Sequence, residues 1–223
     1  MSEKIAHHDF VEVEYTGKFT DGTVFDTTSK EVAQNSNILS EEASYGPVTI
    51  CVGEQQLLPG LDKQLLDKEI GMEYTFSLPP EQAFGKRDIK NLKVIPLSEF
   101  RTHNVQPQPG LQVDVDGRMG FVTSVSGGRV IVNFNHPFAG KEVVYTVKII
   151  KKVTDKKEQL QSYLHSILKL PETDIAIDIQ EEKAIVTLPT DIPAPIQNVF
   201  EKKLQELTKL KQVKIVKKEA KEK

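Results

Sequence analysis

Cysteine and histidine, the residue types most often used for nucleophilic and transition-metal chemistry, occur once and five times in the chain. Cys51 is the only cysteine and lies in the apolar run TICV, so we expect a small buried side chain rather than a nucleophile. The pair His7 and His8 has no other histidine or cysteine nearby, which favours a disordered surface segment over a metal site. Neither Cys51 nor the pair His7-His8 therefore indicates a nucleophile or a metal site.

The stretch 51–85 concentrates apolar residues at the start of one short helix. Pro59 suits the first helical position, because its φ is fixed near the helical value and its missing N–H would be unpaired there. The leucines that recur at helical spacing, and that should bury one face, are Leu58, Leu61, Leu65 and Leu66. Gly71 is predicted to end the helix in a left-handed conformation. Residues 72–78 then alternate as a strand.

The residues before this stretch predict the rest of a first sheet. Residues 10–15 (FVEVEY) alternate apolar and acidic side chains, as a half-buried strand does. Asp21-Gly22 predicts a hairpin turn, after which the strand resumes at 23–25. Residues 29–46 are polar and predict a long surface segment with a helical turn around 38–43.

Residues 86–134 have a different character. Strands at 111–115, 119–125 and 130–134, separated by Gly-containing turns, predict a small antiparallel meander, and one helical turn should begin at Pro96. Residues 143–153 then alternate as a long strand without a partner in this meander. We expect that strand to pair with the first sheet, which makes 86–134 an inserted domain.

From residue 155 onward the apolar pattern predicts the order α-β-β-α-β. All 13 glycines precede residue 154, so this segment has no GXXG loop of the kind that some small RNA-binding domains use. We expect it to mediate homodimerisation or to bind protein substrates, because a small sheet with paired helices often leaves an apolar face or edge. The charged end KKEAKEK is predicted to fray.

Length and composition limit the classes of function. A chain of 223 residues allows two or three small domains, and 27% charged with 38% hydrophobic residues is typical of a globular protein. A net charge of −3 argues against a nucleic-acid partner. No apolar run reaches the roughly 18 residues of a membrane helix, and MSEKIAHHDF lacks the apolar core of a signal peptide. We therefore expect a cytoplasmic protein without a membrane partner.

Three motifs stand in order along the chain: VEVEYTGKFTDGTVFDTT at 11–28, VGEQQLLPGLDKQLLDKEIGMEYTFSLPPEQAFG at 52–85, and VVYTVKII at 143–150. Together they resemble the FKBP-type peptidyl-prolyl cis-trans isomerases. The segment that follows AFG and is closed by HPFAGK resembles the insert-in-flap domain of the long bacterial and archaeal members. The extra C-terminal segment is similar in placement to that of the archaeal long type.

The resemblance implies an α+β fold in which an antiparallel sheet wraps around one short helix. An inserted small β-rich domain and a C-terminal α-β-β-α-β domain complete the expected architecture. The expected domains are the isomerase domain at 1–85 plus 135–153, the insert at 86–134, and the C-terminal domain at 154–223.

The resemblance also implies a proline-binding pocket between helix and sheet. Carried over position by position, its residues are Tyr15, Phe25, Asp26, Leu57, Leu58, Leu61, Phe84 and Tyr145. Leu61 stands where small members often carry tryptophan, and Phe84 where a tyrosine often donates a hydrogen bond. Taken singly, Tyr15 and Phe25 are typical core aromatics and Asp26 a typical turn former, so only the joint pattern indicates a site.

The expected activity is rotation of X-Pro peptide bonds, with no cofactor and no metal. The insert carries more apolar residues than so small a domain can bury, and we expect it to bind unfolded chains as a chaperone through Ile95, Leu97, Phe100, Met119 and Phe121. The alternative is an FKBP-like holdase that grips extended chains with little isomerase activity. The expected partners are unfolded or proline-containing polypeptides and macrolide inhibitors.

Overall fold

The computed structural model describes residues 3–218, so residues 219–223 of the tail predicted to fray lie outside the described residues. The chain forms two compact units: unit 1 comprises residues 1–78 and 143–223, and unit 2 comprises residues 79–142. Unit 2 contains the predicted insert together with the flanking AFG and HPFAGK loops, and the predicted C-terminal domain packs within unit 1. None of the helices within 3–218 is both long and apolar enough to cross a membrane.

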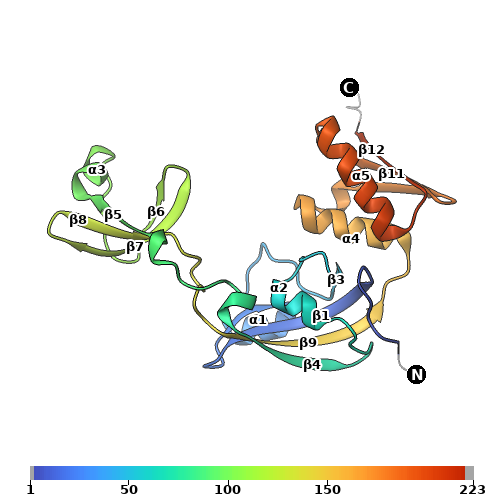
Figure 1. Cartoon of the computed structure of the whole chain (residues 1–223), viewed down its shortest axis with the longest axis horizontal. Coiled ribbons are helices and arrows are strands. Elements are labelled where there is room, and N and C mark those ends of the chain that lie inside the picture. The colour runs from blue at the N-terminus through green and yellow to red at the C-terminus, as the bar shows by residue number, and fades with distance from the viewer. Residues whose placement is uncertain (1–2, 219–223) are drawn as a thin grey trace. The chain divides into compact units, whose positions relative to one another are not determined.

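The sheet of unit 1 has five strands: β1 (Phe10–Phe19), β2 (Val24–Thr27), β3 (Val48–Cys51), β4 (Glu73–Leu78) and β9 (Val143–Lys152). Their order is β2-β1-β9-β4, with β3 paired beside β1, and every pairing is antiparallel. The prediction that the strand after the insert returns to the first sheet is confirmed, because β9 lies between β1 and β4 (Figure 1). β1 also runs four residues further than the predicted 10–15, to Phe19.

One short helix, α2 (Pro59–Gln64), lies against this sheet (Figure 1). Leu61 and Leu65 are fully buried, as the spacing predicted, whereas Leu66 is half-buried. The predicted end of the helix at Gly71 is wrong, because α2 ends at Gln64 and a turn follows. Gly71 does have a positive φ of 84°, and its N–H donates to Ile149 of β9, so it directs the chain into β4.

The polar segment between β2 and β3 also departs from expectation. Its helix, α1 (Lys30–Asn35), lies earlier than the predicted turn around 38–43, which has no helix. The Ser29 side chain accepts a hydrogen bond from the Val32 N–H at 3.3 Å, and this N-cap defines where the helix begins. Ala33 is the buried residue of α1.

The C-terminal segment contains α4 (Lys156–Leu168), a 3-10 helix (Glu172–Asp174), β10 (Ala176–Gln180), β11 (Lys183–Leu188), α5 (Ala194–Thr208) and β12 (Gln212–Lys217). Its three-stranded sheet has the order β10-β11-β12, in which β11 and β12 are parallel. Phe10 and Cys51 belong to the same apolar cluster as the buried residues of α4 and α5. The C-terminal segment therefore shares a core with the first sheet.

Unit 2 contains two 3-10 helices (Pro80–Gln82 and Ile89–Asn91), β5 (Leu92–Pro96), α3 (Leu97–Thr102), β6 (Gln112–Val115), β7 (Arg118–Ser126) and β8 (Arg129–Asn133). Its sheet has four antiparallel strands in the order β5-β8-β7-β6. The predicted three-stranded meander missed β5, since the basic run 86–96 does not alternate cleanly. Its small core includes Val122, Val130 and Val132.

Candidate functional site

The pairing of β1 with β2 contains an irregularity that brings two consecutive residues to one place. The register shifts between Gly17 and Lys18, so Phe25 is the extra residue of a β-bulge. A bulge changes the direction of a side chain and increases the local twist. Phe25 and Asp26 both reach Tyr145 of β9: the two rings meet edge to face at 5.8 Å, and the Asp26 carboxylate accepts a hydrogen bond from the Tyr145 hydroxyl.

The Asp26 carboxylate is held by two tyrosine hydroxyls, those of Tyr15 and Tyr145. Burial raises the pKa of Asp26, and hydrogen bonds from the Thr27 backbone N–H and from both hydroxyls act in the opposite direction. Burial and the nearby Asp26 charge raise the pKa of Tyr15 to about 12 and also raise the pKa of Tyr145. Both hydroxyls are therefore protonated donors at neutral pH.

Gly17 allows this cluster to close. A Cβ atom at this position would lie 2.8 Å from Cζ of Tyr145 and 2.9 Å from Cζ of Phe25, well inside van der Waals contact. The Tyr15 and Tyr145 rings are 5.8 Å apart. Sequence reasoning did not include Gly17 in the site, because a glycine in a strand signals a close approach without saying which residues approach.

The three leucines predicted for the pocket floor lie at the start of α2. Leu61 is fully buried, whereas Leu57 and Leu58 are half-buried. Leu58 directly precedes the helix, and its C=O accepts a hydrogen bond from the Asp62 N–H at 3.0 Å. Within residues 3–218 no acceptor pairs with the Leu58 N–H, as is common for the first donors of a helix. Leu57 and Tyr15 line one groove.

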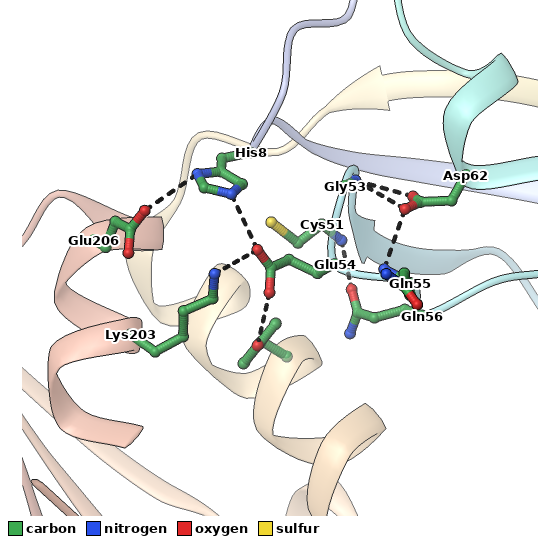
Figure 2. Close-up of polar contacts among 10 residues, drawn as sticks. His8, Cys51, Gly53, Glu54, Gln55, Gln56, Asp62, Lys203 and Glu206 are labelled. Carbon is green, nitrogen blue, oxygen red and sulfur yellow. Dashed lines mark hydrogen bonds and ion pairs between the residues drawn. The ribbon is translucent and has the colours of Figure 1, made fainter. Parts of the chain in front are cut away.

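The loop that leads to these leucines is fixed by the Asp62 side chain (Figure 2). Asp62 is 3% exposed, and its carboxylate accepts hydrogen bonds from the N–H groups of Gly53 (3.0 and 3.1 Å) and Gln55 (3.1 Å). The Gln56 side chain accepts a hydrogen bond from the Cys51 N–H at 2.6 Å. The hydrogen bonds to the Asp62 carboxylate are charge-assisted, and such bonds are among the stronger hydrogen bonds in proteins. Asp62 therefore holds the loop in one conformation.

Glu54 of the same loop connects it to the C-terminal segment (Figure 2). Its carboxylate lies 2.6 Å from Nζ of Lys203 in α5, 3.0 Å from Nε2 of His8, and 3.2 Å from the Tyr163 hydroxyl of α4. His8 also lies 3.9 Å from the Glu206 carboxylate. The prediction of a disordered His7-His8 segment is therefore wrong, because His8 lies inside a polar network. Burial and the adjacent His7 lower the pKa of His8.

Cys51 is buried, as expected for a small apolar residue in a strand. Burial raises the pKa of its thiol to about 12. A thiol with so high a pKa is almost entirely protonated at neutral pH and is a poor nucleophile.

The remaining predicted site residues lie in unit 2. The Phe84 ring stacks on His136 with centroids 4.7 Å apart and meets Phe138 edge to face at 5.2 Å; its place in the proline pocket stays a prediction. Among the insert residues, Ile95 and Phe100 are buried in the small core, Leu97 and Phe121 are half-buried, and Met119 is 54% exposed.

Comparisons with known proteins agree with the motifs. A family model described as FKBP26, IF domain, matches residues 93–138. The short-type peptidyl-prolyl cis-trans isomerase of Methanocaldococcus jannaschii is 34% identical over 149 residues, which cover 67% of this chain and 94% of that protein. The FKBP-type 16 kDa peptidyl-prolyl cis-trans isomerase of Escherichia coli strain K12 is 29% identical over 156 residues, covering 68% of this chain and 95% of the relative.

The FKBP-type peptidyl-prolyl cis-trans isomerase SlyD of Treponema pallidum is 28% identical over 158 residues, covering 68% of this chain and 81% of the relative. The identity and coverage of these relatives, together with the insert-domain match, show that the chain belongs to the FKBP-type peptidyl-prolyl cis-trans isomerases. It is therefore an enzyme of the isomerase class.

Proposed function

We propose that the pocket of unit 1 rotates X-Pro peptide bonds of polypeptide substrates. The observation that carries this proposal is the cluster assembled by the β-bulge, in which the Phe25 and Tyr145 rings lie beside an Asp26 carboxylate held by two hydroxyls. Leu57, Leu58 and Leu61 supply the apolar floor, and the unpaired Leu58 N–H is a donor for a substrate carbonyl.

The chemistry suits a pocket without a nucleophile. Rotation of a peptide bond breaks no σ bond, and its barrier of roughly 18–20 kcal/mol is the resonance lost as the amide twists. The twisted amide has less charge separation between O and N than the planar one. An apolar pocket therefore desolvates the planar ground state more than the twisted state, and this difference accelerates rotation.

The polar edge of the pocket has a separate task. Tyr15 and Tyr145 keep their protons at neutral pH and orient the Asp26 carboxylate. A fixed carboxylate beside the aromatic rings can interact with the dipole of the rotating carbonyl group, whereas a mobile one would have to reorganise during the reaction.

The test of this pocket is the kcat/KM of Phe25→Ala on a short X-Pro tetrapeptide. We expect at least a tenfold decrease, because the ring that packs against Tyr145 is lost. Phe134→Ala, which removes a half-buried ring from unit 2, is the matched control and should act on the tetrapeptide like the wild type. Equal activity of both variants would exclude Phe25 from the site.

For unit 2 we propose chaperone binding of unfolded chains. A groove of about 670 Å³ is lined by Ile95, Phe100, Val105 and Leu111 among others, and Val94 and Met119 are 61% and 54% exposed. Exposed apolar residues gathered on so small a domain are typical of a surface that binds other apolar chains.

Substituting serine for Val94 and Met119 tests this second activity. The double variant should suppress aggregation of an unfolded protein less well than the wild type, while its tetrapeptide activity is retained. Val199→Ser, at a position of α5 that is 70% exposed, is the control. If the wild type suppresses aggregation but does not accelerate tetrapeptide isomerisation, the holdase alternative is correct.

A further inference from the structure

Unit 1 contains a groove of about 670 Å³ that begins at the proposed pocket. Tyr15 and Leu57 line one part of it. From there it runs between β3 and α4, so that its two walls come from the first sheet and from the C-terminal segment. The β3 side carries the apolar residues Val48 and Ile50 together with Pro47, whereas the α4 side carries only polar residues.

The β3 wall is the edge of a sheet. Within residues 3–218, β3 pairs only with β1. The Cys51 N–H donates to the Gln56 side chain rather than to β1, so the backbone groups of Cys51 face away from β1. Because backbone direction repeats every second residue in a strand, the N–H and C=O of Thr49 face the same way, and Thr49 lines the groove.

The α4 wall is one face of a helix. Glu158, Gln161, Ser162 and His165 line the groove, and their spacing of three and four residues places them in one stripe of α4. Lys169, which directly follows the helix, extends this wall. From Glu158 to Lys169 this wall is about 16 Å long at about 1.5 Å per residue. That length corresponds to about five residues of extended chain at about 3.3 Å each.

The charged side chains near the open edge already contact one another. Lys151 lies 3.6 Å from the Glu12 carboxylate and 3.8 Å from that of Glu158, and the Thr49 hydroxyl donates to Glu158 at 3.4 Å. A charged small ligand would have to disrupt these contacts. An extended polypeptide would instead use the backbone groups of the edge strand, and its alternating side chains would meet an apolar and a polar wall.

We propose that this groove binds the part of a substrate polypeptide that flanks the isomerised proline, as an extended strand added to β3. The proposal rests on the proposed function, since it places the proline in the pocket at Tyr15 and Leu57. It makes the C-terminal segment part of the substrate-binding surface. The preferred flanking sequence alternates apolar and uncharged polar residues over about five positions.

The experiment compares a labelled alanine-leucine-proline-phenylalanine tetrapeptide with two longer peptides, in which a valine-serine-valine-serine-valine segment extends the same core on its N-terminal or its C-terminal side. Binding to the full chain is measured by fluorescence anisotropy, and kcat/KM by isomerisation kinetics. We expect one of the extended peptides to bind the wild type at least tenfold more tightly than the tetrapeptide.

Two variants obstruct the groove in different ways. Thr49→Pro removes the outward N–H, at a position where an edge strand tolerates proline, and its control Thr49→Val keeps the N–H but loses the hydroxyl. Ser162→Trp fills the groove from α4, and its control Ile167→Trp adds the same ring at an exposed position outside it. Both obstructing variants should weaken binding of the extended peptide about tenfold more than binding of the tetrapeptide. Ile167→Trp should bind both peptides like the wild type, and Thr49→Val should lose less affinity for the extended peptide than Thr49→Pro does.

The outcomes separate the two proposals. If the extended peptides bind no better than the tetrapeptide, or bind Ser162→Trp as tightly as the wild type, the groove proposal is wrong. If the extended peptide binds in the groove but the wild type does not accelerate isomerisation, the groove proposal holds and the proposed pocket fails. Should Thr49→Pro not fold, Ser162→Trp and its control decide the matter alone.

Discussion

Gly17→Ala should damage the site by adding a single methyl group. The new Cβ would lie 2.8 Å from Cζ of Tyr145 and 2.9 Å from Cζ of Phe25, whereas carbon atoms pack best at about 3.5–4.0 Å. Each ring must therefore move by roughly 0.7–1 Å, or the strands must separate. Overpacking of this kind costs about 1–3 kcal/mol of stability.

The same movement should lower activity, because displacing Tyr145 also disturbs its hydrogen bond to Asp26. A misplacement of about 1 Å in an active site can cost on the order of 100-fold in rate, so we expect kcat/KM on the tetrapeptide to fall by about 10- to 100-fold. Urea unfolding gives the change in stability, and isomerisation kinetics below the unfolding transition give the change in rate.

Gly120→Ala is the matched control for this prediction. Its Cβ would lie 2.7 Å from Cγ1 of Val132 in unit 2, so it also overpacks a strand, but outside the proposed pocket. We expect a comparable loss of stability in unit 2 with tetrapeptide activity close to that of the wild type. Full activity of Gly17→Ala, or an equal loss in both variants, would refute the reasoning.

Three further predictions concern the site and its supports. Burial raises the pKa of Asp26 in the folded protein. Its favourable contribution to stability is therefore present below the unfolded pKa of about 4 and is lost as the pH rises through the folded pKa. The urea midpoint of the wild type should fall relative to that of Asp26→Asn between pH 4 and pH 7, and parallel plots of the two midpoints against pH would contradict this. Lys203→Met leaves the Glu54 carboxylate, which is 10% exposed, without its cation, and should lower the free energy of unfolding in urea by about 1–3 kcal/mol. The control Lys202→Met, at an exposed position, should lower it hardly at all. Equal losses of stability in both variants would show that the ion pair is not the cause. Leu58→Pro removes the unpaired N–H at a φ of −54° that proline accepts, and should raise KM more than Leu58→Ala does; identical kinetics of the two variants would show that this N–H does not bind substrate.

Most elements of unit 1, including those of its C-terminal segment, could be predicted because each has a strong local signal. The alternation in 143–153 predicted β9, and Pro59 predicted where α2 begins. Local signals failed where a contact between distant residues decides the outcome. Gly71 does have the left-handed conformation predicted for it, but α2 ends earlier, at Gln64, and Gly71 instead donates to Ile149 of β9.

The candidate site shows the same limit. The motifs predicted Phe25, Asp26 and Tyr145 as members, but the β-bulge that aligns the first two depends on a register shift that no residue type announces. Glu54 and Tyr163 are separated by 109 residues, so their hydrogen bond could not be read from spacing. His8 was interpreted as a surface residue because its partners, Glu54 and Glu206, lie far along the chain.

We infer that the cluster around Asp26 in unit 1 catalyses the rotation of X-Pro bonds. The most direct test is two-dimensional NMR exchange spectroscopy on an alanine-leucine-proline-phenylalanine peptide. The peptide is mixed with catalytic amounts of the wild type, of Asp26→Ala, or of the double variant Phe25→Ala with Asp26→Ala. Near-ultraviolet circular dichroism shows beforehand that each protein is folded. We expect fast cis-trans exchange with the wild type, a rate at least tenfold lower with Asp26→Ala, and a still lower rate with the double variant. Exchange at the wild-type rate with both folded variants would contradict this inference.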